Sequence, residues 1–105
     1  MKKISSAELD ALVAEATVDA YGEYEQLDSF AVVIGDRLAL PFETTVLGVT
    51  VTVTAIELNP GNQITARCRR GRYRQAIGVL DLPVPTPPPD GWDWVEAYRH
   101  WTSLN

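Results

Sequence analysis

Carboxylates dominate the first third of this chain, and their type and spacing suit the binding of a cation. Eight Asp or Glu residues lie between Ile4 and Asp36, and that window contains no Lys and no Arg. Three of them are spaced four residues apart, so that they would stack on one side of a helix: Glu15, Asp19 and Glu23. Carboxylate oxygens are hard ligands, which suit calcium or magnesium better than zinc or copper. A cation site is one hypothesis; a solvated acidic face and pairing with the arginines of the chain are two others.

The acidic pattern differs from that of an EF-hand. A loop that began at Asp19 would place Phe30 at its twelfth position, where a bidentate Glu belongs, and would have no Gly at its sixth. Carboxylates on adjoining elements, with Gly22 between them, suit the irregular coordination shell of calcium better than the octahedral shell of magnesium. A cation site here would therefore be a calcium site of another type.

Arginines form a second cluster, which is confined to one short stretch: Arg67, Arg69, Arg70, Arg72 and Arg74. In a strand, Arg67 and Arg69 lie on the face opposite Ala66 and Cys68, so we expect them to face solvent. Three uses remain open for this cluster. It could neutralise the acidic helices, bind phosphate or nucleic acid with Tyr73 nearby, or dock a protein partner. The net charge of −5 disfavours nucleic acid as a partner.

Residues that could support catalysis are few. His100 is the only histidine, and the sequence assigns it no Ser or Asp partner. Cys68 is the only cysteine, and its position is expected to face the core. A cysteine in such a position is more often a small core residue than a nucleophile. The sequence has no glycine-rich phosphate loop and no His or Cys metal spacing. We therefore expect a protein that is not an enzyme.

Two N-terminal helices are expected to carry the acidic residues. The first runs from Ser5 to about Tyr21, with Ser5 and Glu8 at capping-box spacing and Gly22 as its stop. The second runs from Asp28, as N-cap, to about Leu38, and Pro41 then forces an extended chain. Apolar residues recur at helical spacing in both segments, which predicts one buried face on each helix.

Strand patterns begin after Pro41. Residues 49–53 alternate strictly between Val and Thr, which is typical of an antiparallel strand with one wet side. Residues 42–47, 64–68 and 73–80 read as three further strands, and an Asn-Pro-Gly-Asn turn precedes the second of these. A meander of this size favours a small SH3-like antiparallel barrel of four or five strands.

The last quarter of the chain is a proline-rich segment followed by a helix. Residues 81–90 contain five prolines, which indicates a stiff, extended crossing over the surface. A helix then begins at Asp90 or Gly91, and its aromatic residues recur every three or four positions: Trp94, Tyr98 and Trp101. This amphipathic stripe is expected to dock on the barrel or on the first helix.

The 105 residues are expected to form one α+β domain. It divides into a helical acidic segment (1–40), the β-barrel meander (41–80), the proline-rich crossing (81–90) and the C-terminal aromatic helix (91–105). No apolar run approaches the roughly 20 residues of a membrane span, and the N-terminus lacks the apolar core of a secretory signal. We therefore expect a cytoplasmic protein with no membrane contact.

Four motifs in this order resemble the small bacterial calcium-binding proteins typified by cyanobacterial CcbP. They are "LVAEATVDAYGEYEQ", "DRLALPFETTVLG", "RCRRGRYRQAIGVLDLP" and "WVEAYRHW", and together they cover the chain from about Leu12 to Trp101. The resemblance implies an SH3-like core and calcium bound by acidic side chains without an EF-hand. It implies these metal-binding residues: Asp19, Glu23, Glu25, Asp36 and Glu43. Since Gly22, Tyr24 and Gly35 replace acids expected in that family, the implied affinity is low to moderate.

The leading expectation is thus a non-catalytic calcium-binding protein that acts as a buffer or sensor. The alternative is a metal-free interaction or inhibitor module. Such a module could mimic nucleic acid with its acidic surface, or dock a protein through its arginines or through its aromatic helix. The candidate docking residues are Arg67, Arg69 and Arg72, or else Trp94, Tyr98 and Trp101.

Overall fold

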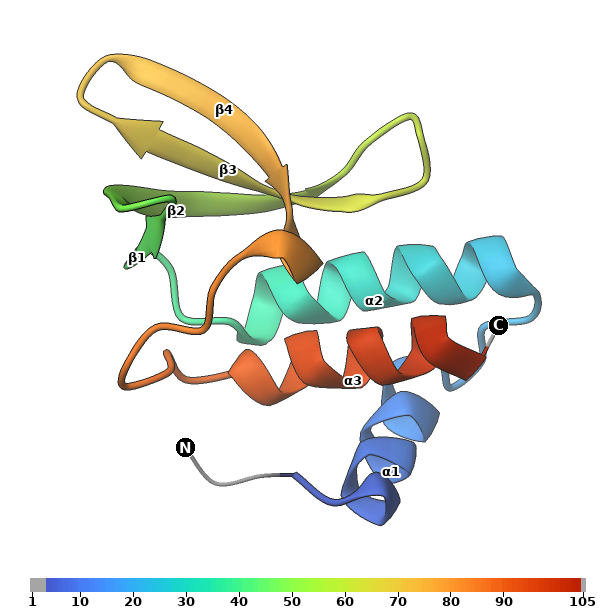
Figure 1. Ribbon diagram of the computed structural model, residues 1–105. Helices are drawn as coiled ribbons and strands as arrows, with labels where there is room; N and C mark the ends of the chain where they lie inside the picture. The colour runs from blue at the N-terminus through green and yellow to red at the C-terminus, as the bar shows by residue number, and fades with distance from the viewer. Residues whose placement is uncertain (1–3, 105) are drawn as a thin grey trace.

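The computed structural model describes residues 4–104, which form three α-helices, one 3-10 turn and one sheet (Figure 1). In chain order the elements are α1 (Ser6–Ala16), α2 (Glu23–Arg37), β1 (Phe42–Val46), β2 (Val49–Leu58), β3 (Ile64–Arg70), β4 (Tyr73–Gly78), η1 (Val79–Asp81) and α3 (Trp92–Leu104). The α+β class is therefore confirmed. No helix within residues 4–104 is long and apolar enough to cross a membrane.

The first helix starts as expected and ends earlier. The Ser5 hydroxyl accepts a hydrogen bond from the Glu8 backbone N–H, which confirms the predicted cap. The helix was predicted to reach Tyr21, but α1 ends at Ala16, and Asp19 has a positive φ of 62° that no helix accommodates. Asp19 therefore lies in the turn between α1 and α2, and the next acidic residue, Glu23, already belongs to α2.

The second helix has its N-cap at Gly22, six residues before the predicted N-cap Asp28. Gly22, with φ of 98°, turns the chain, and the Glu25 carboxylate accepts a hydrogen bond of 2.9 Å from the Tyr21 backbone N–H. This carboxylate ties down the chain just before the helix, although Gly22 supplies no side-chain cap. Asp28, the predicted N-cap, lies inside the helix instead.

The four strands pair in sequence order as an antiparallel meander, β1-β2-β3-β4. The predicted alternation is confirmed, because Val53, Ala66 and Cys68 all lie buried on the same face. β2 continues past Val53 to Leu58, with a register shift between Val53 and Ala55 that marks a bulge.

The sheet is open, so the predicted SH3-like barrel is not confirmed. β1 pairs only with β2 and β4 only with β3 among the described residues, whereas a barrel needs its first and last strands to close on each other. Helices cover one face of the sheet instead: α2 and α3 lie beneath it, and α1 packs against α3 on the far side (Figure 1).

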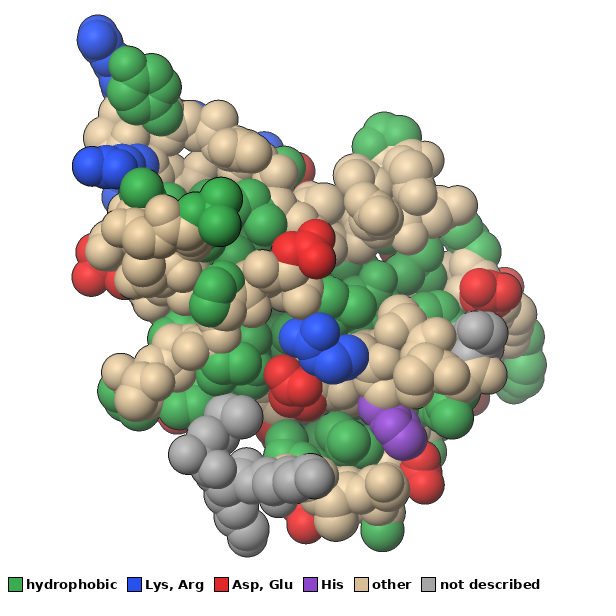
Figure 2. All heavy atoms as spheres, in the orientation of Figure 1, with side chains coloured by type: hydrophobic (Ala, Val, Ile, Leu, Met, Phe, Trp, Pro, Cys, Tyr) green, Lys and Arg blue, Asp and Glu red, His purple; other side chains and the backbone are tan. Residues whose placement is uncertain are grey.

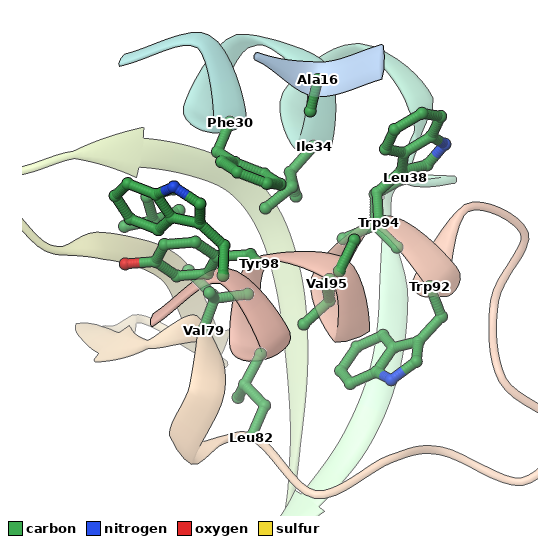
Figure 3. Packing of buried hydrophobic residues seen from close by; sticks show 14 of the residues in the cluster. Ala16, Phe30, Ile34, Leu38, Val79, Leu82, Trp92, Trp94, Val95 and Tyr98 are labelled. Carbon is green, nitrogen blue, oxygen red and sulfur yellow. The ribbon is translucent and has the colours of Figure 1, made fainter. Parts of the chain in front are cut away.

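Aromatic residues from α2 and α3 fill the space under the sheet (Figure 3). The ring of Phe30 lies 5.7 Å from that of Tyr98 and 5.4 Å from that of Trp101, centroid to centroid. Phe30 is fully buried, and burying such a side chain contributes about 1.5–3 kcal/mol. The aromatic stripe of α3 therefore packs within the core, in contact with both other helices.

The proline-rich segment crosses the molecule from η1 back to α3. The Thr44 hydroxyl on β1 donates a hydrogen bond of 2.9 Å to the Pro83 carbonyl, which holds the segment beside that strand. At its end, the Ala39 N–H donates a bond of 2.8 Å to the Asp90 carbonyl. Gly91 has φ of 87°, and a β-carbon there would lie 2.1 Å from the Arg37 carbonyl oxygen. Glycine is thus required where α3 begins against the end of α2.

Candidate docking surface

The five carboxylates that the resemblance assigns to calcium lie on four different parts of the chain. Glu23 and Glu25 occupy the first turn of α2, where the positive end of the helix dipole stabilises them. Asp36 lies in the last turn of the same helix, and its carboxylate is 3.6 Å from the Arg37 guanidinium. Asp19 belongs to the turn before α2, and Glu43 is exposed on β1.

These carboxylates do not form one coordination shell. Glu23 and Asp36 are thirteen positions apart on one helix, which places them about 20 Å apart along its axis. Glu15, Asp19 and Glu23 do not stack either, because α1 ends at Ala16. Within residues 4–104 no three His, Cys, Asp or Glu side chains are grouped so that they could hold a metal. Calcium binding stays a prediction, and these residues do not fit a preformed site.

The arginines, in contrast, gather at one end of the sheet. We define the arginine hairpin as residues 69–74, which join β3 to β4 and carry Arg69, Arg70, Arg72 and Arg74. Figure 2 shows Lys and Arg side chains grouped over this hairpin, whereas acidic side chains lie mainly over other parts of the visible face. In the part of the chain that the structure describes, no carboxylate lies within 4 Å of these four guanidinium groups.

Arg67 differs from its neighbours because it is already neutralised. Its guanidinium forms a salt bridge with the Glu57 carboxylate of β2. The interpretation that the arginines offset acidic residues therefore applies to Arg67 alone, and its partner lies on the sheet rather than on an acidic helix. Arg67 is thus a natural reference against which the hairpin arginines can be compared.

Strand register places two hairpin arginines directly opposite each other. Arg69 and Arg74 are cross-strand partners, so their β-carbons lie about 4.5–5.5 Å apart on the face of the sheet turned away from the helices. Like charges in this arrangement destabilise a sheet. On the other face Arg70 pairs with Tyr73, whose side chain is 72% exposed, and the Arg72 guanidinium lies 5.9 Å from the Tyr73 ring centroid.

A shallow apolar slot lies beside the hairpin on the helix side of the sheet. It encloses about 330 Å³ and is lined by apolar residues of three strands, with arginines at its rim: Val49, Val51, Cys68, Ile77, Tyr73, Arg69, Arg70 and Arg74, together with Gln75. Figure 1 shows why the slot is open: the hairpin end of the sheet projects past the helices. Val49 and Val51 were expected to face the core, yet they remain partly exposed for this reason.

The aromatic helix, the other docking candidate, lies inside the molecule. Trp94, Tyr98 and Trp101 are only 6%, 6% and 7% exposed. The Trp101 indole N–H also donates a hydrogen bond of 3.0 Å to the Gln26 side-chain oxygen of α2. These three residues therefore stabilise the fold and offer a partner little surface.

Cys68 and His100, the two residues considered for catalysis, both have structural roles. Cys68 is 2% exposed, and burial raises the pKa of its thiol, which makes it a poor nucleophile at neutral pH. His100 Nε2 lies 2.7 Å from a carboxylate oxygen of Asp10, a partner that the sequence did not reveal, and this contact ties α3 to α1. Within residues 4–104 no buried side-chain nitrogen or oxygen lacks a hydrogen-bond partner, so the interior presents no unfilled polar site.

Comparison with known proteins identifies no relative of this chain. The chain matches no protein-family model, no curated protein and no solved structure. The resemblance to the CcbP proteins therefore stays a prediction. The class that fold and surface define is architectural: an α+β domain in which three helices lie on one side of an open four-stranded sheet that ends in an arginine hairpin.

Proposed function

We propose that this protein is a non-catalytic interaction module that docks an anionic partner through its arginine hairpin. One observation carries the proposal: four arginines lie within six residues, with no carboxylate within 4 Å of them in residues 4–104. Guanidinium groups bind carboxylates and phosphates through two parallel hydrogen bonds, which are stronger than neutral ones. A partner that supplied such oxygens would remove the repulsion between Arg69 and Arg74.

The distribution of charge over the molecule supports an oriented encounter. The chain carries a net charge of −5, and its acids are concentrated in the first 36 residues, on and between α1 and α2. An anionic partner would be repelled by the helices and attracted by the hairpin. Complementary and opposing patches of this kind steer association and fix orientation.

We also propose that the sheet is a partial SH3-like barrel, and this proposal rests only on the order of its strands. Four consecutive antiparallel strands form the sheet, as such a barrel requires. A complete barrel would also need β1 and β4 to pair with each other, which they do not do within residues 4–104. Docking requires no such closure, because the arginine hairpin lies wholly on β3 and β4.

Binding of a fluorescent oligoglutamate peptide, followed by anisotropy, tests the function. We expect affinity that falls as salt is added, and a loss of at least about tenfold for Arg69→Gln, since a charge-assisted hydrogen bond contributes about 1.5–3 kcal/mol. Replacing all four hairpin arginines by Gln should abolish binding. Arg67→Gln is the matched control, because that arginine already has a carboxylate partner.

Equal affinity for the wild-type protein and the variant without hairpin arginines would refute the proposal. Circular dichroism and thermal melting of each variant show whether the fold survives. All four side chains are exposed, so we expect intact folding throughout.

A further inference from the structure

The two edge strands of the open sheet, β1 and β4, differ in whether another part of the chain covers them. β1 is covered: Thr44 is hydrogen-bonded to the Pro83 carbonyl, and the residues that follow, Val84 to Thr86, line the same surface hollow as Thr44 and Thr45. Pro83 and Pro85 have no N–H to donate, so this cover is a poor template for a further strand. Covering an edge prevents unwanted pairing with another chain. Among the residues that the structure describes, only the β1 edge is covered in this way.

β4 forms the other edge, and it is open. Within residues 4–104 it pairs only with β3, and its first four residues, 73–76, are all exposed. An uncovered edge strand presents unpaired backbone N–H and C=O groups, which can accept a further strand. The open edge is also the part of the sheet that carries the arginine hairpin.

Successive residues of an added strand would meet different chemistry on the two faces of the sheet. On the outer face the nearest side chain is that of Arg74, with Arg69 opposite it on β3. On the inner face the strand would pass Tyr73 and Ile77 at the rim of the apolar slot. Because side chains of a strand alternate between faces, the surface suits a segment that alternates acidic and apolar residues.

We infer that the anionic partner is an extended acidic segment of another protein, which adds a strand to β4. This inference rests on the proposed function and names its partner class. The acidic side chains pair with Arg69 and Arg74, the apolar ones enter the slot beside Tyr73, and the backbones share hydrogen bonds. One added strand would thus contact the arginines, the apolar slot and the open edge of β4 at the same time.

Two simpler explanations account for less of the surface. Arginines on β4 would guard an edge against self-association, but Arg69 and Arg70 belong to the interior strand β3, which needs no guard. A single-stranded nucleic acid would use the arginines and stack on Tyr73. It would leave the strand edge and the apolar slot unused.

Amide hydrogen exchange measured by NMR tests the inference on the full chain. The probe is a synthetic peptide in which Glu and Val alternate. The controls are a peptide of the same composition with its Glu and Val in separate blocks, an N-methylated copy of the alternating peptide that cannot pair by its backbone, and an oligothymidylate. We expect the alternating peptide alone to slow exchange at least tenfold at those amides of residues 73–76 that face the open edge, and to bind at least tenfold more tightly than the N-methylated copy.

Variants complete the test. Arg74→Gln should weaken the alternating peptide about tenfold, whereas Arg67→Gln should leave its affinity unchanged. If all peptides bind equally and the edge-facing amides of residues 73–76 gain no protection, strand addition is wrong. Loss of binding in the variant without hairpin arginines would still uphold the proposed function. Tighter, hairpin-dependent binding of oligothymidylate would overturn the partner class. If the peptides bind the variant without hairpin arginines as tightly as they bind the wild-type protein, both proposals are wrong.

Discussion

Replacing Arg74 by Glu should make the protein more stable while it removes partner binding. Arg74 lies directly across the strand pair from Arg69, and no carboxylate of residues 4–104 lies within 4 Å of either. The exchange converts a like-charge pair into an opposite-charge pair. Each such cross-strand effect amounts to about 0.2–1 kcal/mol, so relief of repulsion and gain of attraction together should raise the free energy of unfolding by about 1 kcal/mol.

Thermal and urea denaturation measure this change. For a domain of this size, 1 kcal/mol raises Tm by about 4 °C. The buried tryptophans of α3, such as Trp94, report unfolding by fluorescence and lie away from the substitution. The gain should shrink as salt is added, because both residues are exposed to solvent. Arg74→Gln, which removes repulsion without adding attraction, should give about half the gain.

A double-mutant cycle separates this pair from general effects of charge. Arg69→Glu should stabilise the protein as Arg74→Glu does, while the double Glu variant restores a like-charge pair and loses both gains. A double variant as stable as the two single effects combined would refute the pairing of these side chains. So would a lower Tm for Arg74→Glu at low salt. If Arg74→Glu is more stable than the wild-type protein and no longer binds the partner, then the Arg69–Arg74 pair is kept for function at the expense of stability.

Other predictions follow from single residues. Gly35→Ala should raise the free energy of unfolding by about 1 kcal/mol in a urea titration, since Gly35 lies inside α2 and an added β-carbon meets nothing within 4 Å. Gly91→Ala should lower Tm by at least several degrees, because the added carbon would strike the Arg37 carbonyl; an unchanged Tm would contradict this packing. Burial raises the pKa of Cys68 above its ordinary value of 9.0, so the native state keeps this proton longer than the unfolded chain does. Its contribution to stability is present below pH 9.0 and is lost as pH rises through the native pKa; Cys68→Ala should flatten that alkaline loss in melts across pH. If the protein binds no calcium, calcium and EDTA should leave Tm unchanged, whereas a rise with calcium and not with magnesium would support calcium binding.

Local patterns predicted most of the fold because they report which side of an element is buried. Alternation in residues 49–53 identified a strand whose Val53 is fully buried. The start of α2 was missed because Asp28 is a good N-cap by type, whereas the chain starts its helix at Gly22 and relies on the Glu25 carboxylate to hold Tyr21. Closure of the sheet was beyond local patterns, because it depends on how α2 and α3 pack beneath it.

The candidate site was harder to predict, since it depends on distances between elements. Carboxylates close in sequence, such as Glu23 and Asp36, prove remote because one unbroken helix separates them. The arginine cluster was visible in the sequence, and a tight turn at Gly71 places Arg69 opposite Arg74 once the register is known. The slot lined by Val49 was invisible, because no pattern shows where the helical layer stops.

The overhang of the hairpin beyond the helices separates recognition from folding. Residues 69–74 extend beyond the buried core, which reaches along β3 only as far as Cys68. Exchanging this tip for one of different charge should therefore redirect the module to a new partner while the scaffold stays intact. Natural variation could use the same freedom, with specificity changing at the tip and the body of the domain unaltered.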